Sequence, residues 1–358
     1  LRERGHRVLV LCAGHEEMAE GGDWEDAHGT PVRIIGKGTK RRWLGHIFAL
    51  GVIREIWRLR NQFEVVYFLM QGLHLAAGLP LCRLLGLNVV MKISGSGLVD
   101  LMKETLIGRL ELRWLDQWAK RVMVLNAGME QEAINAGIRK EKLFWMPNPV
   151  DVNEFVPVGQ ARKKELRKEL QVPADAMCLV YVGRLAPEKE LGSLIDAFRV
   201  FRQREERAHL ILVGSGPEEQ ALREQAQRNG VEGAVSFAGR QPMDRVLKYL
   251  QASDVFTLVS RLEGFPCSLI EAMAVGLPAV VSRIPANQQL VNDGEHGQSG
   301  EVGNANSLAE AMEWVGVDPE RRMSMGSAAR ERIVNLYSTE KIAQRYEELF
   351  ALATGESR

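Results

Sequence analysis

The chain has 358 residues, 46% hydrophobic and 26% charged, which allows two domains and excludes a mostly disordered protein. Its 46 Lys and Arg residues balance its 46 Asp and Glu residues. The overall positive charge typical of nucleic-acid-binding proteins is therefore absent, and we expect no nucleic-acid partner. No apolar run reaches the roughly 18 residues that a membrane-spanning helix needs.

The four cysteines are far apart in the sequence: Cys12, Cys82, Cys178 and Cys267. They form no C-x-x-C pair, which argues against a zinc module and against a disulfide framework and fits a reducing compartment. The sequence also lacks the basic flank, apolar core and small-residue cleavage site of a signal peptide. We therefore expect a cytoplasmic protein.

Apolar runs of strand length alternate with longer helical patterns along the chain. In the first half the predicted strands are 7–12, 32–35, 65–69, 89–93, 122–125 and 143–146, and the helices are 43–60, 73–85, 106–120 and 129–136. In the second half the strands are 178–182, 210–213, 235–237, 255–259 and 279–281, and the helices are 160–171, 191–204, 218–229, 243–250 and 268–274. The alternation predicts an α/β fold built of βαβ units with parallel sheets.

The two halves meet near residues 147–151, where Pro147 and Pro149 remove backbone donors and restrict the chain direction. We therefore divide the chain into two Rossmann-like domains at about residue 150. From Ser307 onward the pattern is helical, and the last helix is expected at 341–353.

The segment 183–189 follows a predicted apolar strand and contains Gly183, Arg184 and Lys189. In open α/β sheets, ligands bind outside the carboxyl ends of the strands, and glycine there lets the backbone approach a ligand. Arg184 and Lys189 lie across one turn, so both can converge on an anion such as phosphate. A solvated basic loop is the alternative.

Two further segments also follow predicted strands. Gly214 and Gly216 form a Gly-x-Gly turn, which fits a plain connection as well as a binding loop. Glu263 lies in the turn before a helix expected to start near Pro266, and Glu271 lies about one turn into that helix. Unpaired amides at such a helix start bind phosphate or sugar oxygens, and a carboxylate can bind two vicinal hydroxyls.

These three segments together resemble the donor domain of the retaining GT-B glycosyltransferases of family 4. The resemblance rests on Gly183-Arg184 with Lys189, on the 213–217 turn, and on the Glu263-x7-Glu271 pair; it covers roughly residues 120–300 well and the first half more loosely. It implies two Rossmann-like domains with parallel sheets facing across a cleft. Residues 1–150 would be the acceptor-side domain and 151–338 the nucleotide-sugar donor domain, with 339–358 a helix that crosses back to the first domain.

The resemblance also implies residue roles. Arg184 and Lys189 would hold the diphosphate of the donor, and Glu263 would contact the transferred sugar; these are the expected catalytic residues. Glu271 would bind the ribose, and the base would lie near Gly239 and Arg240. The full set of expected donor-binding residues is Gly183, Gly214, Gly216, Gly239, Arg240, Gly264, Phe265, Pro266, Ser268, Leu269 and Glu271.

The implied activity is a metal-independent, retaining hexosyltransferase that moves a sugar from a nucleotide-sugar to a hydroxyl by a front-face mechanism. Two cations facing a diphosphate would stabilise the leaving group without a metal. The sequence has no Asp-x-Asp motif of the kind that holds a diphosphate through a metal ion. No cofactor is expected, and UDP-sugars are preferred to GDP-sugars on family frequency alone. The acceptor would be a sugar, a lipid-linked molecule or a small molecule. An inactive sugar-nucleotide-binding protein and a GT-B epimerase are the alternatives.

The first half departs from the family pattern. Relatives begin with a strand and a Gly-rich loop, whereas this sequence starts inside the following helix, so a central strand is expected to be missing from the first sheet. Ser94 stands where relatives often carry a histidine. Ser94, Gly95 and Ser96 remain candidate substrate contacts, with a plain Gly/Ser-rich turn as the alternative.

A basic and aromatic patch in the first half suggests a membrane contact. It consists of Lys37, Lys40, Arg41, Arg42, Trp43 and Trp57. Many relatives act at a membrane through such a patch, so peripheral contact with the inner membrane face is an expectation. A solvated helix face is the alternative.

Overall fold

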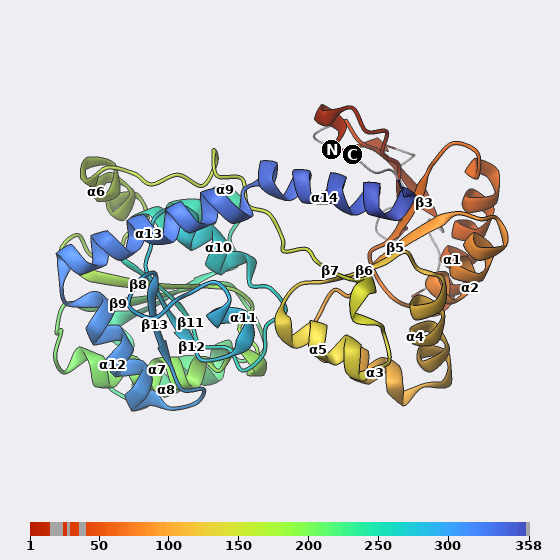
Figure 1. Ribbon diagram of the computed structural model, residues 1–358. Helices are drawn as coiled ribbons and strands as arrows, with labels where there is room; N and C mark the ends of the chain where they lie inside the picture. The colour runs from red at the N-terminus through yellow and green to blue at the C-terminus, as the bar shows by residue number, and fades with distance from the viewer. Residues whose placement is uncertain (15–23, 27–28, 36–40, 356–358) are drawn as a thin grey trace. The chain divides into compact units, whose positions relative to one another are not determined.

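The computed structural model describes residues 1–14, 24–26, 29–35 and 41–355 (Figure 1). The chain divides into two compact units: unit 1 is Leu1–Pro147 with Ala343–Arg358, and unit 2 is Asn148–Ile342. The boundary falls within the proline-containing join of the sequence. The last helix, α14 (Thr339–Thr354), begins in unit 2 and continues into unit 1.

Unit 2 contains a six-stranded sheet in the order β10-β9-β8-β11-β12-β13, and every neighbouring pair is parallel. The strands are β8 (Met177–Val182), β9 (Ala208–Val213), β10 (Val235–Gly239), β11 (Val255–Leu258), β12 (Ala279–Ser282) and β13 (Gly297–Gly300). All residues of β9, β11 and β12 are buried, as a sheet covered on both faces requires. The strand order reverses between β8 and β11, so a topological switch point lies there.

Helices cover both faces of this sheet, with α7, α8 and α12 on one side and α9, α10 and α13 on the other (Figure 1). Their bounds are α6 (Gln160–Glu169), α7 (Leu191–Arg202), α8 (Glu219–Arg228), α9 (Met243–Ala252), α10 (Cys267–Ala274), α11 (Pro285–Gln288), α12 (Ala305–Gly316) and α13 (Pro319–Tyr337). The sequence analysis missed β13, because its Gly-Gln-Ser-Gly segment has no apolar run. A Cβ at Gly297 would lie 1.9 Å from the carbonyl oxygen of Ala279, so this strand needs glycine to pair with β12.

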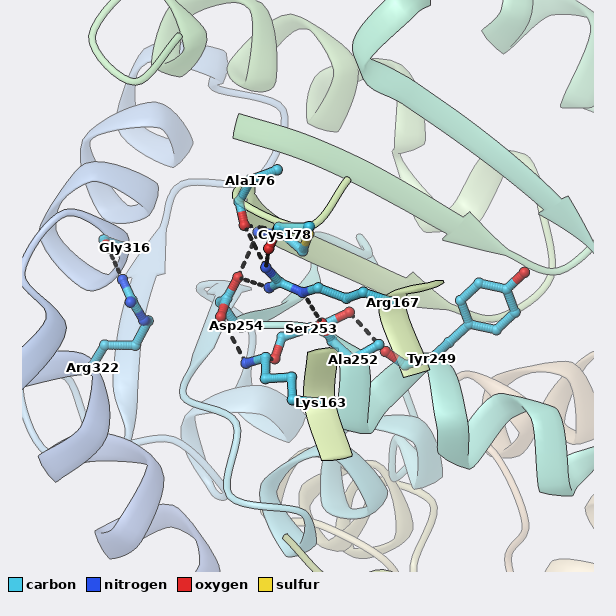
Figure 2. Close-up of polar contacts among 11 residues, drawn as sticks. Lys163, Arg167, Ala176, Cys178, Tyr249, Ala252, Ser253, Asp254, Gly316 and Arg322 are labelled. Atoms are coloured by element: carbon cyan, nitrogen blue, oxygen red, sulfur yellow. Dashed lines mark hydrogen bonds and ion pairs between the residues drawn. The ribbon is translucent and has the colours of Figure 1, made fainter. Parts of the chain in front are cut away.

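An ion-pair cluster fixes α6 to the amino edge of the sheet (Figure 2). The carboxylate of Asp254 lies 2.7 Å from Lys163 Nζ and 2.6 Å from Arg167 Nη2, and it accepts the Cys178 N–H at 2.7 Å. Arg167 also donates to the carbonyls of Ala174, Ala176 and Ala252. Burial raises the pKa of Asp254, but the two cations outweigh burial and the net pKa is lowered.

Unit 1 contains two sheets. The first has the order β1-β3-β2 and the second β4-β5-β6-β7. Their strands are β1 (Val10–Ala13), β2 (Trp24–Glu25), β3 (Pro31–Ile35), β4 (Val65–Phe68), β5 (Asn88–Lys92), β6 (Arg121–Val124) and β7 (Leu143–Trp145). Within the described ranges no strand joins β1 to β4, so the two sheets stay separate.

Strand β2, which the sequence analysis did not predict, runs antiparallel to β3. The Asp26 N–H donates to the Thr30 carbonyl at 3.0 Å, which closes a tight turn between the two strands. Such a short connection allows only antiparallel pairing, because a parallel crossover needs a dozen or more residues. An antiparallel edge strand is common in α/β folds, so the α/β prediction is confirmed.

The helices of unit 1 are α1 (Arg41–Leu59), α2 (Leu73–Leu84), α3 (Leu98–Glu104), α4 (Leu106–Trp118) and α5 (Ala127–Asn135). Helix α3 was not predicted. Thr105 adopts an extended conformation between α3 and α4, and its Oγ1 accepts the Gly108 N–H at 3.0 Å, which caps α4. None of the helices among the described residues is long and apolar enough to span a bilayer.

Candidate functional site

The predicted donor residues of unit 2 gather at the carboxyl edge of its sheet, beside the topological switch point. One loop follows β8 and carries Arg184 and Lys189; the other follows β11 and carries Glu263. The two loops touch, because the Arg261 N–H donates to the Glu188 carbonyl at 2.9 Å. The fold therefore places side chains 74 positions apart next to each other.

Lys189 and Glu263 form the centre of this site. Lys189 Nζ lies 2.7 Å from Glu263 Oε1, and Ser260 Oγ donates to the same oxygen at 2.6 Å. The side chains of Lys189 and Glu263 are 20% and 10% exposed, so the pair is partly screened from water. One of the three ammonium donors of Lys189 is used in this contact, and the structure gives the ammonium no second partner among the described residues.

Arg184 does not join this pair. Its side chain is 67% exposed and forms an ion pair with Glu188 in the same loop. Its backbone is held in place, because the buried Tyr181 hydroxyl donates to the Arg184 carbonyl at 2.9 Å. Burial, together with the negative charges of Glu263 and Glu188, raises the pKa of Tyr181, so this hydroxyl stays neutral.

The glycines of the site allow the strand-end loops to interlock. A Cβ at Gly214 would lie 1.8 Å from the Gly183 carbonyl oxygen, and a Cβ at Gly216 would lie 2.1 Å from that of Leu185. The Gly214 N–H donates to the Gly239 carbonyl at 2.8 Å, which ties in the loop that leads to the exposed Arg240. The structure thus gives Gly214 and Gly216 a packing function, and any donor contact would be additional.

Helix α10 begins beside Glu263. Pro266 is its N-cap residue, and the first turn contains Ser268 and Leu269, whose amides belong to the positive end of the helix. The Phe265 side chain is buried, with its ring centroid 5.7 Å from that of Tyr337. Only the backbone of Phe265, with Gly264 and Pro266 on either side, is therefore placed to meet a ligand.

Glu271 lies on the second turn of α10, apart from the Lys189 and Glu263 pair. The pKa of its carboxyl is raised mainly by burial, and the negative charge of Glu154 raises it further. The structure gives its carboxylate no hydrogen bond or ion pair with any described residue. A half-buried carboxylate without a partner is suited to accept hydrogen bonds from ligand hydroxyls.

The candidate residues of unit 1 lie in the loop after β5. Ser94, Gly95 and Ser96 are followed by Gly97, whose N–H donates to both Glu132 carboxylate oxygens at 3.0 and 3.2 Å. This bond ties the loop to α5. The described part of the chain contains no group of three or more His, Cys, Asp or Glu side chains arranged to hold a metal ion.

Sequence reasoning missed several contacts of the site. The sequence analysis singled out none of Ser260, Arg261 and Glu190. In the structure Glu190 has a left-handed backbone (φ 53°) and its carboxylate pairs with Arg261.

Two family profiles match most of the chain. The profile "Glycosyl transferases group 1" matches residues 162–332, and "Glycosyl transferase 4-like domain" matches residues 1–149. The first contains the donor residues described above. The chain belongs to the group 1 glycosyltransferases, and the predicted family is confirmed.

Two curated relatives are 30% and 32% identical to this chain over the parts that align. LpsE, a lipopolysaccharide core biosynthesis glycosyltransferase of Rhizobium meliloti, is 32% identical over 60% of this chain and 61% of its own length. The N-acetyl-alpha-D-glucosaminyl L-malate synthase of Bacillus anthracis is 30% identical over 52% of this chain and 48% of its own. The chain thus spans about half to three fifths of the length of these relatives.

Solved structures show the same fold at low sequence identity. Anabaena HepE in complex with UDP and glucose has a TM-score of 0.74 at 22% identity, covering 90% of this chain and 87% of its own. Sucrose-phosphate synthase from Thermosynechococcus elongatus has a TM-score of 0.80 at 21% identity, and the match covers 99% of this chain and 91% of that structure's chain. The GT-B fold prediction is therefore confirmed.

Proposed function

We propose that this protein is a retaining glycosyltransferase that transfers a sugar from a nucleotide-diphosphate donor to an acceptor hydroxyl. The observation that carries the proposal is the contact of Lys189 with Glu263 across the switch point of unit 2. Ligands of open α/β sheets bind at such a point. Family membership supports the reaction class, and the names of the relatives support a sugar donor.

The chemistry we propose is stabilisation of the leaving group. The bond between the anomeric carbon and the diphosphate oxygen breaks while the acceptor oxygen bonds to the same carbon on the same face. The acceptor proton passes to an oxygen of the departing phosphate. Lys189 offers its unused donors to the growing negative charge, and the exposed Arg184 can leave Glu188 to do the same. Glu263 orients the transferred sugar.

Glu271 is the residue we propose for ribose recognition, because its carboxylate is half-buried and has no described partner. The α10 N-terminus, with the Ser268 and Leu269 amides, would receive phosphate oxygens. We propose UDP as the preferred nucleotide over GDP. HepE was solved with UDP, whereas a phosphatidylinositol monomannoside mannosyltransferase of Mycobacterium tuberculosis, 28% identical over 57% of this chain, is named GDP-mannose-dependent.

A thermal-shift screen tests the donor site. We expect one of UDP, GDP, ADP and TDP to raise the melting temperature of the wild type but not of Lys189→Ala. A ligand present at about 100 times its dissociation constant adds about 2.7 kcal/mol, which such a screen detects. Lys248→Ala is the control, because Lys248 pairs with Glu169 outside the site. Stabilisation of wild type and Lys189→Ala alike would place the nucleotide elsewhere.

A transfer assay separates the enzyme from a protein that only binds the donor. We expect release of nucleoside diphosphate from the nucleotide-sugar identified by the screen, either to an acceptor or slowly to water. Nucleotide binding without any release would support the binding-only alternative.

We also propose a lipid-linked or sugar acceptor and a place at the inner membrane face, in a reducing cytoplasmic compartment. All four cysteines are free, which supports the reducing compartment. Of the predicted membrane patch, Lys37 and Lys40 and the side chains of Arg41 and Arg42 lie outside the described residues. Trp43 and Trp57 are exposed on α1, which supports a membrane contact there.

A further inference from the structure

Two serines and one asparagine at the carboxyl edge of the unit 2 sheet are fully buried. Ser260, Ser282 and Asn287 are each 0% exposed. Ser260 follows β11, Ser282 is the last residue of β12, and Asn287 lies in α11. Burying a polar side chain is unfavourable unless it is hydrogen-bonded, so the partners of these three residues indicate what they do.

Their hydrogen bonds form a chain with a fixed direction. Asn287 Nδ2 donates to the Ser282 carbonyl at 2.9 Å and to Ser282 Oγ at 3.1 Å. Ser282 Oγ donates in turn to the Ser260 carbonyl. Because a carbonyl only accepts, the one hydroxyl proton of Ser282 points to Ser260, and its oxygen accepts from Asn287. Ser260 Oγ then donates to Glu263 Oε1 at 2.6 Å, the same oxygen that Lys189 contacts.

The Ser282 hydroxyl holds the chain where β11 and β12 stop pairing. Their parallel register ends at Leu258 and Val281. Beyond that pair, the Ser282 side chain supplies a hydrogen bond to the Ser260 carbonyl. A fixed Ser260 backbone limits the directions in which its own Oγ can point, and this hydroxyl contacts Glu263 three residues later.

The Asn287 amide is only half used. Its Oδ1 is buried and has no hydrogen-bond partner among the described residues. Its backbone is fixed, because its N–H donates to the Ile284 carbonyl and its carbonyl accepts the N–H groups of Leu290 and Val291. A half-satisfied buried polar network is less stable than apolar side chains of the same shape. Stability alone therefore does not explain the amide, whereas the two bonds that Nδ2 donates to Ser282 do.

We propose that Ser282 and Asn287 are positioning residues, which hold the Glu263 carboxylate beside Lys189 through Ser260. Both are fully buried, so neither touches the donor. The functional part of this inference rests on the proposed function, in which Glu263 orients the transferred sugar. The chain of hydrogen bonds itself does not depend on it. A displaced Glu263 carboxylate changes how the sugar reacts and leaves the binding of the bare nucleotide intact.

Kinetics of Ser282→Ala test the positioning role. We expect kcat with the nucleotide-sugar to fall roughly tenfold, which corresponds to the loss of one well-formed hydrogen bond. The affinity for the bare nucleoside diphosphate should stay unchanged in calorimetric titration. Asn287→Ala should lower kcat in the same direction by a smaller factor. Ser282→Thr keeps a hydroxyl and should retain most of the wild-type kcat.

Ser253→Ala provides the matched control. Ser253 is also 0% exposed, and its Oγ donates to the Tyr249 carbonyl at 2.7 Å at the amino edge of the sheet (Figure 2). This variant should lower the melting temperature much as Ser282→Ala does, but kcat per folded molecule should stay at the wild-type value. A merely structural role of Ser282 predicts that both variants keep kcat.

A double-mutant cycle in urea unfolding tests the chain without any transfer activity. Effects of residues that act through one network are not additive, whereas effects of distant, independent residues add. We expect Ser282→Ala to destabilise the protein less when Glu263→Ala is already present. The effect of Ser253→Ala should be the same with and without Glu263→Ala.

The two experiments separate failure of this inference from failure of the proposed function. A wild type that binds no nucleotide and transfers no sugar would refute the proposed function, and the stability cycle would still decide about the chain. Additive effects of Ser282→Ala and Glu263→Ala would overturn the chain whatever the activity. In an active protein, a wild-type kcat in Ser282→Ala, or an equal loss in Ser253→Ala, would overturn the positioning role.

Discussion

Unit 2 carries an ion-pair cluster at each edge of the same sheet, and the two differ in how far their donors are used. At the amino edge Arg167 forms four hydrogen bonds, and Asp254 accepts from two cations and a backbone amide (Figure 2). At the carboxyl edge Lys189 uses one donor, on Glu263. The amino-edge cluster of Arg167, Lys163 and Asp254, here called the closed cluster, has its donors used and holds the fold together. The carboxyl-edge pair of Lys189 and Glu263, here called the open cluster, has unused donors that can bind a ligand.

The largest effect is expected at the open cluster. Lys189→Ala should lower kcat by about 10²–10³, the usual loss when one donor to a developing negative charge is removed. Steady-state kinetics with the best nucleotide-sugar measure it. Lys163→Ala, in the closed cluster, should keep kcat per folded molecule. Similar losses of kcat in both variants would contradict the comparison.

The second effect tests stability at the closed cluster. Arg167→Ala should lower the free energy of unfolding by about 3–5 kcal/mol, since it removes one of the two cations paired with the buried Asp254 carboxylate and leaves three carbonyls without their Arg167 donor. Urea titration measures this change. Lys189→Ala is the counterpart and should cost far less; equal costs would mean that the open cluster is also structural.

The third prediction concerns Glu271, at the carboxyl edge of the sheet. Glu271→Gln should weaken nucleotide binding about 10- to 100-fold, because it replaces a charged acceptor of ribose hydroxyls. It should also make the free protein somewhat more stable at neutral pH. The pKa of Glu271 is raised in the folded state, so folding is penalised once the pH exceeds the pKa of the unfolded chain. Calorimetric titration and melting curves check both, and a destabilised variant would be the contrary result.

The smallest effect is the acid sensitivity of the closed cluster. The folded-state pKa of Asp254 is lowered, so its contribution to stability is present above the unfolded-state pKa and is lost as the pH falls through the folded-state value. One such group changes the stability by at most about 1.4 kcal/mol per pH unit. Asp254→Asn should flatten this part of the acid unfolding curve, and an unchanged curve would contradict the prediction.

Much of the fold follows from the sequence because buried parallel strands are continuous apolar runs. The predicted strands of unit 2 fall within two residues of β8 to β12. Strand β13 could not be found this way, since its pairing depends on a glycine that allows close approach to Ala279 and not on apolar side chains. Helix α3 was missed because it has only seven residues, which is too few for a clear helical pattern in the sequence.

The candidate site, like the fold, has features that the sequence predicted and contacts that it did not. The segments carrying Lys189, Glu263 and Glu271 were predicted from residue type and from their position after apolar strands. The sequence did not show that Arg184 turns to Glu188, that Ser260 shares an oxygen of Glu263, or that Glu190 reaches Arg261. Each of these contacts depends on side-chain directions, which neighbouring loops determine.

By itself the sequence determined the βαβ alternation, the place of the join and the residue types at the strand ends, because hydrophobic burial and backbone geometry act locally along the chain. Only the tertiary structure decided which charged side chains have all their hydrogen-bonding groups occupied and which keep unused donors for a ligand. The partners of Asp254 and of Lys189 come from chain segments that are far apart in the sequence and that only the folded sheet brings together.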